Sequence, residues 1–501
     1  MHRRTFCKSA LAAGIAASLA GYSGARSQTP TDRGAFIPAV SSNGAELSIE
    51  TAAIAELAAA LKGRLYLQGD EGYAGAKAVW NGMFDHKRPA MVAQCESTAD
   101  VVNAVDFARE RNLLVSVKGG GHSLPGKSTA DGGMMIDLSR MHAVEIDADA
   151  QQLRAGGGAL LGHLDRAALA QALMTTTGIV SHTGIGGFTL GGGFGRTDRK
   201  MGLAIDNLLA ATVVTAAGDV VHASDGENPD LFWGLRGGGG NFGIATEFVY
   251  RLHPFNPTVF GGNLVYPLAR DFLAFYAEFN ESLPDEANLE PQLIPNDEGR
   301  PVIVAQATWC GNHAAGAKAL APLREFPGLL SGELGPRSYQ AIQTADDEFL
   351  GHGRQYYLKS GLLNELTPDA IKVIVEYAGR AGPASWFQHL GGASARVAPD
   401  ATAYPHRNAA FNFGIMYIGD EPSGNDAGRA AVREYYAAME PHMAGFYTNL
   451  NEDSADKTTG NYGANYPRLV NLKNRYDPTN LFRLNANIRP TLATGGSGRT
   501  E

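Results

Sequence analysis

Apolar positions follow two different spacings in the first half of the chain. Helical spacing predicts a helix over 98–109, and apolar and small residues predict others over 54–61 and 160–173. The continuous apolar run 113–117 predicts a buried strand, and it leads directly into the glycines 119–121. This part of the chain is therefore predicted to contain helix, strand and glycine loop in succession.

The pattern changes after Pro254 and Pro257. Up to that point, glycine clusters separate strand-like stretches such as 211–216. Beyond it the clusters stop, and strand-like stretches such as 302–309 alternate with helical ones. Because 501 residues exceed the size at which one hydrophobic core usually stops growing, we expect at least two domains, with a boundary near residue 256.

The first 27 residues have the composition of an export signal. They contain four basic residues and no acid, a short apolar run over 11–19, and small residues before Gln28. The adjacent Arg3 and Arg4 resemble a twin-arginine signal, which exports proteins that have already folded. We therefore expect residues 1–27 to be removed and the mature protein to be periplasmic or secreted.

The remaining chain is acidic, with 38 basic and 51 acidic residues and a net charge of −13. Such a charge repels nucleic acid and anionic lipid headgroups, so neither is an expected partner. The apolar runs are all shorter than the ~20 residues that a membrane-spanning helix needs, and we expect no membrane anchor.

Cysteines and histidines give little support for a metal site. The three cysteines are Cys7, Cys95 and Cys310, and the first lies in the signal segment. None of them has metal-ligand spacing, no paired-histidine motif is present, and we predict no metal. One bridge between Cys95 and Cys310 remains an open alternative.

Two glycine motifs match known nucleotide-binding patterns in an unsuitable context. Residues 121–128, GHSLPGKS, fit the P-loop pattern, but the following TADGG cannot form the first turn of the helix that a P-loop needs. Gly238, Gly240 and Gly243 fit the Rossmann pattern, but β-branched and aromatic residues follow them. The sequence therefore disfavours an NTPase and a Rossmann fold.

Three glycine-dense segments remain, 119–123, 184–195 and 237–243. Bare backbone offers amide donors and positive-φ turns, which can bind a pyrophosphate without cationic side chains. Any one of these segments alone is better explained as a tight turn between strands. Three in one region, one of them containing a histidine, favour a bound nucleotide cofactor.

Five motifs in order resemble the berberine bridge enzyme-like FAD-linked oxidases of the vanillyl-alcohol oxidase superfamily. They are KGGGHS at 118–123, GIGGFTLGGGFG at 184–195, GLAIDN around Asp206, DLFWGLRGGGGNFG at 230–243 and the terminal YDPTNLFRLNANIRP. The resemblance covers about 69–254 and 447–490. It implies an α+β, two-domain, PCMH-type flavoprotein, in which a discontinuous FAD-binding domain (45–256 and 446–501) surrounds an inserted α+β substrate domain (257–445).

The resemblance implies FAD as cofactor, bonded covalently to His122 through the flavin 8α carbon. Val180 stands where some members have a second attachment through cysteine, so a single link is expected. The other cofactor-binding residues that the resemblance implies are Lys118, Gly119, Gly120, Gly121, Ser123, Gly184, Gly187, Gly191, Gly192, Gly193, Asp206, Gly240, Gly243, Ile244, Asn449 and Asn487.

The sequence departs from the family pattern at three positions near the predicted flavin. Lys118 replaces an arginine, which keeps the charge and loses the planar fork. His182 and Thr183 replace threonine and valine. Residue size at the Thr183 position governs access of dioxygen in the family, and threonine has nearly the shape of valine, so we expect an oxidase.

For the reaction, the resemblance implies a tyrosine base in a YxN element, which Tyr447 and Asn449 match. An ordinary phenol has a pKa of ~10 and is a weak base at neutral pH, so Tyr447 needs local activation. Two strand-like stretches, 387–392 and 409–419, are expected to face the substrate. Their candidate contact residues are Gln388, His389, Asn412 and Tyr417.

The implied reaction is a two-electron oxidation of a carbon that bears a hydroxyl or amine, with electrons passing to O2 to give hydrogen peroxide. The substrate is a small organic molecule, and the sequence does not choose among sugars, alkaloids and phenolics. Two alternatives stay open: a flavin dehydrogenase with another electron acceptor, and an exported flavin-binding protein without turnover.

Overall fold

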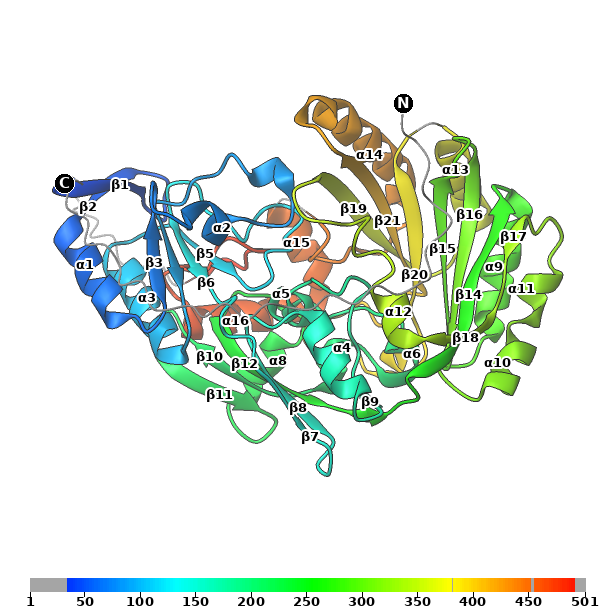
Figure 1. Cartoon of the computed structure of the whole chain (residues 1–501), viewed down its shortest axis with the longest axis horizontal. Coiled ribbons are helices and arrows are strands. Elements are labelled where there is room, and N and C mark those ends of the chain that lie inside the picture. Colours follow the sequence, from blue (N-terminus) through cyan, green and yellow to red (C-terminus); the bar gives the residue numbers. More distant parts are fainter. Residues whose placement is uncertain (1–33, 381, 452–454, 492–501) are drawn as a thin grey trace, which may run out of the picture.

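The computed structural model describes residues 34–380, 382–451 and 455–491. The predicted signal segment, 1–27, lies outside these residues. Helices and sheets are mixed in two lobes that lie side by side (Figure 1). The first lobe holds the strands up to β13 and the last helices of the chain, and the second holds the strands from β14 to β21. The α+β prediction is confirmed.

Two sheets organise the first lobe. The smaller has the order β3-β4-β6-β5, with β3 antiparallel to β4 and the other neighbours parallel. The larger has the order β11-β10-β12-β8-β7 and is antiparallel throughout. Two further strand pairs, β1-β2 and β9-β13, also belong to this lobe. Its strands are β1 (Phe36–Val40), β2 (Glu46–Glu50), β3 (Arg64–Leu67), β4 (Met91–Gln94), β5 (Val115–Lys118), β6 (Met134–Asp137), β7 (Val144–Asp147), β8 (Gln152–Gly156), β9 (Leu173–Met174), β10 (Leu208–Val214), β11 (Val220–Ser224), β12 (Ile244–Arg251) and β13 (His253–Pro254).

A single antiparallel sheet organises the second lobe, in the order β17-β14-β16-β15-β20-β21-β19, with β18 also paired to β14. Helices α9, α13 and α14 pack on one face of it through a large apolar core, which leaves the other face available to the first lobe. The strands are β14 (Thr258–Pro267), β15 (Ala287–Pro295), β16 (Pro301–Trp309), β17 (Ser331–Gly332), β18 (Gly335–Ser338), β19 (Gln355–Leu363), β20 (Ala384–His389) and β21 (Phe411–Gly419).

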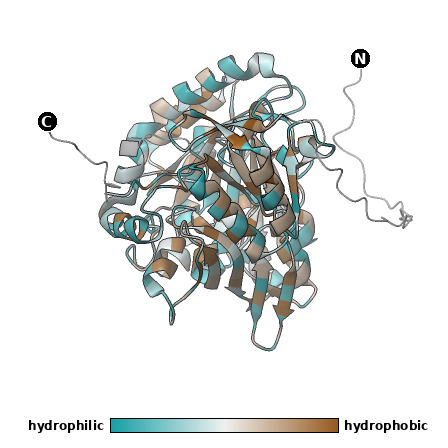
Figure 2. Ribbon diagram, turned by 90° about the vertical axis from the view of Figure 1, so that its left-hand side faces the viewer, coloured by the Kyte–Doolittle hydropathy of each residue, from teal (hydrophilic) through white to brown (hydrophobic). Residues whose placement is uncertain are grey.

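The helices cover the sheets with their apolar faces inward (Figure 2). They are α1 (Thr51–Ala60), α2 (Tyr73–Lys77), α3 (Thr98–Glu110), α4 (Leu161–Leu169), α5 (Ile185–Leu190), α6 (Asp198–Met201), α7 (Ala204–Asn207), α8 (Pro229–Leu235), α9 (Arg270–Ser282), α10 (His313–Ala319), α11 (Ala321–Glu325), α12 (Tyr339–Gln343), α13 (Pro368–Ala378), α14 (Asn425–Met439), α15 (Ala455–Tyr462) and α16 (Tyr466–Tyr476). No helix within the described ranges is long and apolar enough to cross a membrane.

The C-terminal segment packs in the first lobe. Leu469 and Leu472 of α16 belong to the same apolar core as Phe232 of α8. Farther on, Leu481 and Phe482 join the core beneath α1 and α3. Residues more than 200 positions apart in the sequence therefore share two cores.

The local predictions hold at most of these elements. The predicted helix over 98–109 is α3, in which the Ser97 hydroxyl accepts a hydrogen bond from the Asp100 N–H and caps the first turn. The helix predicted over 160–173 ends earlier, at Leu169, because the chain turns into β9. Residues 129–133 form no helix, as the argument against a P-loop requires. Cys95 and Cys310 are both buried free thiols, so the open alternative of a bridge between them is wrong.

Candidate flavin site

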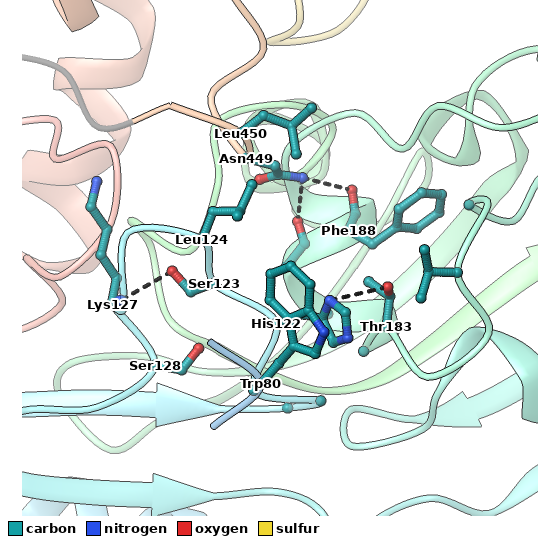
Figure 3. Close-up of a pocket in the computed structure, with 18 of the residues that line it drawn as sticks. Trp80, His122, Ser123, Leu124, Lys127, Ser128, Thr183, Phe188, Asn449 and Leu450 are labelled. Carbon is teal, nitrogen blue, oxygen red and sulfur yellow. Dashed lines mark hydrogen bonds between the residues drawn. The ribbon is translucent and has the colours of Figure 1, made fainter. Parts of the chain in front are cut away.

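One cavity of about 440 Å³, part of which Figure 3 shows in close-up, lies where the two lobes meet. All three glycine-dense segments contribute to its wall. The second lobe contributes the uncovered face of its sheet, and the C-terminal segment contributes residues around Asn449. Its volume is within the ~300–1,000 Å³ range of small-molecule and cofactor sites. Predicted site residues in the lining are Gly119, Gly120, Gly121, His122, Ser123, Gly184, Gly187, Gly240, Gly243, Ile244, Gln388, Tyr447 and Asn449.

Glycine is required where the first two of these segments touch. A Cβ atom on Gly120 would overlap the backbone nitrogen of Gly184, and one on Gly184 would overlap that of Gly120. Gly187 differs, since a Cβ there would meet no atom of the described chain within 4 Å. The glycines thus serve two purposes: some allow close backbone packing, and others leave the cavity wall bare.

His122 is held at the cavity wall by three neighbours. Its ring stacks on Trp80, with centroids 4.4 Å apart, and Trp80 stacks in turn on Tyr356. Its Nδ1 lies 3.4 Å from the Thr183 hydroxyl, and its Nε2 lies 2.6 Å from His182 Nδ1. Burial, together with the nearby His182 and His352, lowers the pKa of His122 well below its ordinary value. The ring is therefore neutral at neutral pH and has a lone pair available for bonding.

The histidine cluster of His122, His182 and His352 was not found from the sequence. Their ring nitrogens lie within 4.8 Å of one another, the spacing of a candidate metal site. However, two nitrogens bound to one tetrahedral zinc ion are about 3.4 Å apart, since each lies ~2.0–2.1 Å from the metal. The 2.6 Å separation of His122 Nε2 and His182 Nδ1 is a hydrogen bond. The positions differ by 60 and 170 residues, so no sequence motif could reveal the cluster.

Tyr447 lies in the cavity wall with its ring stacked on Phe194, at 4.1 Å between centroids. Its phenol oxygen accepts hydrogen bonds from the Gly193 N–H over 3.1 Å and the Asn449 side-chain amide over 2.8 Å. Burial raises the pKa of Tyr447 to about 12, against the opposing effect of these two donors. The side chain is thus a phenol at neutral pH in this environment.

Several predicted cofactor residues lie behind the wall. Gly191, Gly192 and Gly193 pack against Asn449, Tyr404 and Tyr447, and so hold the predicted base in place. Lys118 points away: its ammonium forms an ion pair with Asp137 over 3.2 Å and donates to the Ala76 carbonyl.

Asp206 and Asn487 also lie outside the lining. Asp206 accepts two hydrogen bonds from the Arg407 guanidinium, at 2.8 and 2.9 Å. Asn487 has a buried side-chain oxygen with no hydrogen-bond partner among the described residues. Neither Lys118 nor Asp206 lines this cavity, and both side chains have partners elsewhere in the protein.

The four predicted substrate residues lie on two different faces of the second-lobe sheet. Gln388 lines the cavity, and Asn412 beside it donates to the Gln388 side-chain oxygen over 2.7 Å. His389 and Tyr417 lie on the opposite face and pack in the apolar core, so the expectation that they contact substrate is wrong. Successive residues of a strand point to opposite faces, so only one of two adjacent residues can face the cavity.

A buried polar cluster centred on Arg196 joins the two lobes. The guanidinium donates to Gln343 over 2.7 Å and to Gln306 over 2.9 Å, and lies 3.7 Å from the carboxylates of Glu290 and Asp346. Burial raises the pKa of Glu290. Because Asp346 also lines the cavity, the cluster links this part of the cavity wall to the sheet of the second lobe.

A second buried ion pair holds the third glycine segment. Lys473 and Asp477 are both 0% exposed and 2.6 Å apart. The Lys473 ammonium also donates to the carbonyls of Asn241 and Phe482, each over 2.9 Å. The terminal motif that includes Asp477 therefore fixes the backbone beside Gly240, although neither member of the pair lines the cavity.

Comparison with known proteins matches two family models at these same segments. Residues 89–224 match the FAD binding domain family, and residues 447–489 match the berberine and berberine-like family. An FAD-linked oxidoreductase of Dictyostelium discoideum is 30% identical over 454 residues, which are 88% of this chain and 97% of that protein. The chain belongs to the berberine bridge enzyme-like FAD-linked oxidoreductases.

Further relatives match this chain over most of its length. The (R)-6-hydroxynicotine oxidase of Paenarthrobacter nicotinovorans is 30% identical over 456 residues, covering 86% of this chain and 97% of that protein. The crystal structure of 6-hydroxy-D-nicotine oxidase from Arthrobacter nicotinovorans superimposes with a TM-score of 0.78 at 28% identity, over 85% of this chain and 98% of that one. A chitooligosaccharide oxidase structure gives a TM-score of 0.76 at 26% identity, over 87% and 99% of the two chains.

This berberine bridge enzyme-like chain binds FAD, and its cavity suits that cofactor. The wall offers bare backbone at Gly187, Gly239 and Gly240, where a Cβ would meet no described atom within about 3.5 Å. Ser123 and Lys127 lie at the same wall, and the Ser123 hydroxyl accepts a hydrogen bond from the Lys127 backbone (Figure 3). Amide donors, hydroxyls and one cation are the groups that bind a pyrophosphate.

Proposed function

We propose that this chain is an FAD-dependent oxidase that removes a hydride from a hydroxyl- or amine-bearing carbon of a small organic substrate. One observation carries the proposal: the glycine segments, the free face of the second sheet and the Tyr447 phenol all line one cavity. The names of two relatives, (R)-6-hydroxynicotine oxidase and chitooligosaccharide oxidase, support oxidation of small organic molecules.

The proposed cofactor attachment is a single covalent bond to His122. His122 lines the cavity in its neutral state, as a nucleophile requires. Val180, at the position of a second attachment in some relatives, also lines the cavity and offers no sulfur. Cys95 and Cys310, the cysteines of the described chain, lie in apolar clusters outside the lining.

In the proposed reaction, bound FAD would supply the redox chemistry: it would take a hydride from the substrate carbon and pass two electrons, together with two protons, to dioxygen to give hydrogen peroxide. Tyr447 accepts the proton that the substrate hydroxyl loses. The Gly193 N–H and the Asn449 amide already point at the phenol oxygen, so they stabilise the phenolate without rearrangement. Phe194 holds the ring in position by stacking.

The second lobe supplies the wall that faces the substrate. Its lining combines apolar side chains with two amides, Gln292 and Gln388. Asn412 fixes the Gln388 side-chain oxygen, so the NH₂ group of Gln388 is the part free to bind a substrate oxygen. The apolar members of this wall include Ile294, Leu358, Trp386 and Met416. A substrate with one apolar face and one hydrogen-bond acceptor fits this wall.

Oxidase and dehydrogenase are separated by one experiment on the purified holoenzyme. The protein is reduced under argon with candidate secondary alcohols and amines, and air is then admitted while flavin absorbance and peroxide are followed. Thr183, beside His122 in the cavity wall, supports rapid reoxidation, because it is no larger than the valine of oxygen-reactive relatives. Slow reoxidation would show a dehydrogenase, and failure of every substrate to reduce the flavin would favour a binding protein.

Export through a twin-arginine signal is part of the proposal. Folding with FAD before export suits a cofactor that is attached in the cytoplasm. Replacing Arg3 and Arg4 together by lysine should retain the protein in the cytoplasm, which cell fractionation measures. Unchanged export of that variant would contradict a twin-arginine route.

A further inference from the structure

The position of His182 is fixed from both sides. On one side its Nδ1 lies 2.6 Å from His122 Nε2. On the other its Nε2 lies 3.3 Å from the backbone carbonyl oxygen of Asp347. The loop that carries His182 is anchored as well. The Asp347 carboxylate accepts one hydrogen bond from the Ser181 N–H over 2.9 Å and another from the Ser181 hydroxyl.

These contacts determine which nitrogens carry protons. A carbonyl oxygen only accepts, so His182 Nε2 must be the donor and carry hydrogen. In neutral His182 the other nitrogen, Nδ1, is then unprotonated and accepts from His122 Nε2. His122 therefore holds its proton on Nε2, and its lone pair is on Nδ1, which meets only the long, 3.4 Å contact with Thr183.

We propose that His182 is the positioning residue for covalent flavin attachment: it selects the His122 tautomer whose Nδ1 is the nucleophile, and it accepts the Nε2 proton as the bond forms. The inference rests on the covalent link proposed above. It goes further by naming the bonding atom and a second residue that the step needs.

A C–N bond forms between His122 Nδ1 and the flavin 8α carbon, while one C–H bond of that methyl group and the Nε2–H bond of His122 break. Two electrons remain on the flavin ring, which also takes up two protons, one from the methyl group and one passed on through His182. Dioxygen then removes both electrons and both protons as hydrogen peroxide, and the oxidised, attached cofactor results.

Three features of the surroundings favour this step. The Trp80 ring stacks on His122 and prevents it from turning away from His182. His182 itself is half-buried, so its hydrogen bond to His122 is shielded from water. The hydrogen bonds from Ser181 to the Asp347 carboxylate hold the loop that carries His182 in place.

The experiment compares purified full-length variants by acid precipitation, which separates covalently attached flavin in the pellet from dissociated FAD in the supernatant. The His182→Ala variant should bind FAD but attach it about a hundredfold more slowly than the wild type when incubated with FAD in air. Added imidazole should restore part of the rate, since it can occupy the vacated space and accept the proton. A purely structural role for His182 would not give this rescue.

His352→Ala is the matched control, because it removes a histidine of the same cluster that has no hydrogen bond to His122 among the described contacts. It should attach flavin at the wild-type rate. If His182→Ala purifies without any flavin, His182→Asn decides, since its amide oxygen can accept from His122 but cannot take up the proton. Wild-type attachment rates in His182→Ala or His182→Asn would overturn the role of His182 alone, whereas a wild-type protein without attached flavin would overturn the covalent link itself.

Discussion

The Asn449 side-chain amide donates a hydrogen bond to the Tyr447 phenol oxygen over 2.8 Å. Asn449 is fixed in turn, because its amide nitrogen also lies 2.9 Å from the carbonyl oxygen of Gly187 in the cavity wall. The Gly193 N–H is a second donor to the same phenol oxygen, at 3.1 Å. Burial nevertheless has the larger effect and raises the pKa of Tyr447 to about 12. Tyr447 is thus protonated at neutral pH, and the two hydrogen-bond donors that would stabilise its phenolate are already in place.

Replacing Tyr447 by phenylalanine should lower the rate of flavin reduction by substrate about 10²- to 10⁴-fold, the ordinary contribution of a general base. The ring of the variant keeps the stacking on Phe194, so flavin content and melting temperature should stay close to those of the wild type. Stopped-flow reduction under argon measures the effect. An undiminished rate would remove Tyr447 from the mechanism.

The pH dependence of reduction follows from the raised pKa of Tyr447. Below about pH 12 the phenolate fraction increases tenfold for each pH unit, so kcat/KM should increase with pH over the stable range. Asn449→Leu removes one donor to the phenolate, which raises the pKa of Tyr447 further and lowers the rate at any given pH on this limb. Tyr447→Phe is the control and should show no such limb. A pH-independent wild-type profile would contradict the assignment.

Gly120→Ala should separate close packing from cofactor contact. Its Cβ would overlap the backbone of Gly184, and we expect a loss of about 1–3 kcal/mol in the free energy of unfolding. Gly187→Ala should leave the stability of the flavin-free protein nearly unchanged and weaken FAD binding, because its Cβ would project into the cavity. Gly226→Ala, where a Cβ meets no atom within 4 Å and which lies outside the cavity lining, is the neutral control for both. Equal melting temperatures of Gly120→Ala and Gly226→Ala would show that segments 119–123 and 184–195 do not need to be in close contact.

Asp477→Asn should be among the most destabilising single changes in the chain. It leaves the fully buried Lys473 ammonium without its anion, at a cost of about 3–5 kcal/mol, and loosens the backbone at Asn241. The exposed pair of Arg468 and Asp230 is the comparison, and Asp230→Asn should cost less than about 1 kcal/mol. Chemical denaturation of the holoenzymes measures both. Similar losses for the two variants would contradict the anchoring role of Asp477.

Local signals in the sequence predicted what local physics determines. The glycine segments and the helix over 98–109 follow from spacing and backbone freedom, and the structure has both of them. Whether Gln388 or His389 faces the cavity depends on how β20 pairs with β21. The sequence of β20 alone does not specify this, because either polar side chain is compatible with either face of the sheet. The partners of Lys118 and Asp206 are likewise set by tertiary packing.

The histidine cluster shows the limit most clearly. His122 stood out because it follows three glycines, whereas His352 belongs to a loop with no motif. Their approach depends on the second lobe folding back over the first and on the anchoring of Ser181 by Asp347. Contacts of this kind are long-range, and the local pattern of residues along one chain does not record them.

Acid precipitation of the purified wild-type protein tests the central claim most directly, since that claim is that the three glycine segments hold one FAD that is bonded to His122. The account predicts a yellow pellet, a peptide containing His122 that carries the flavin mass, and a colourless pellet from His122→Ala. A colourless wild-type pellet, with all flavin in the supernatant or none in the protein, would contradict it.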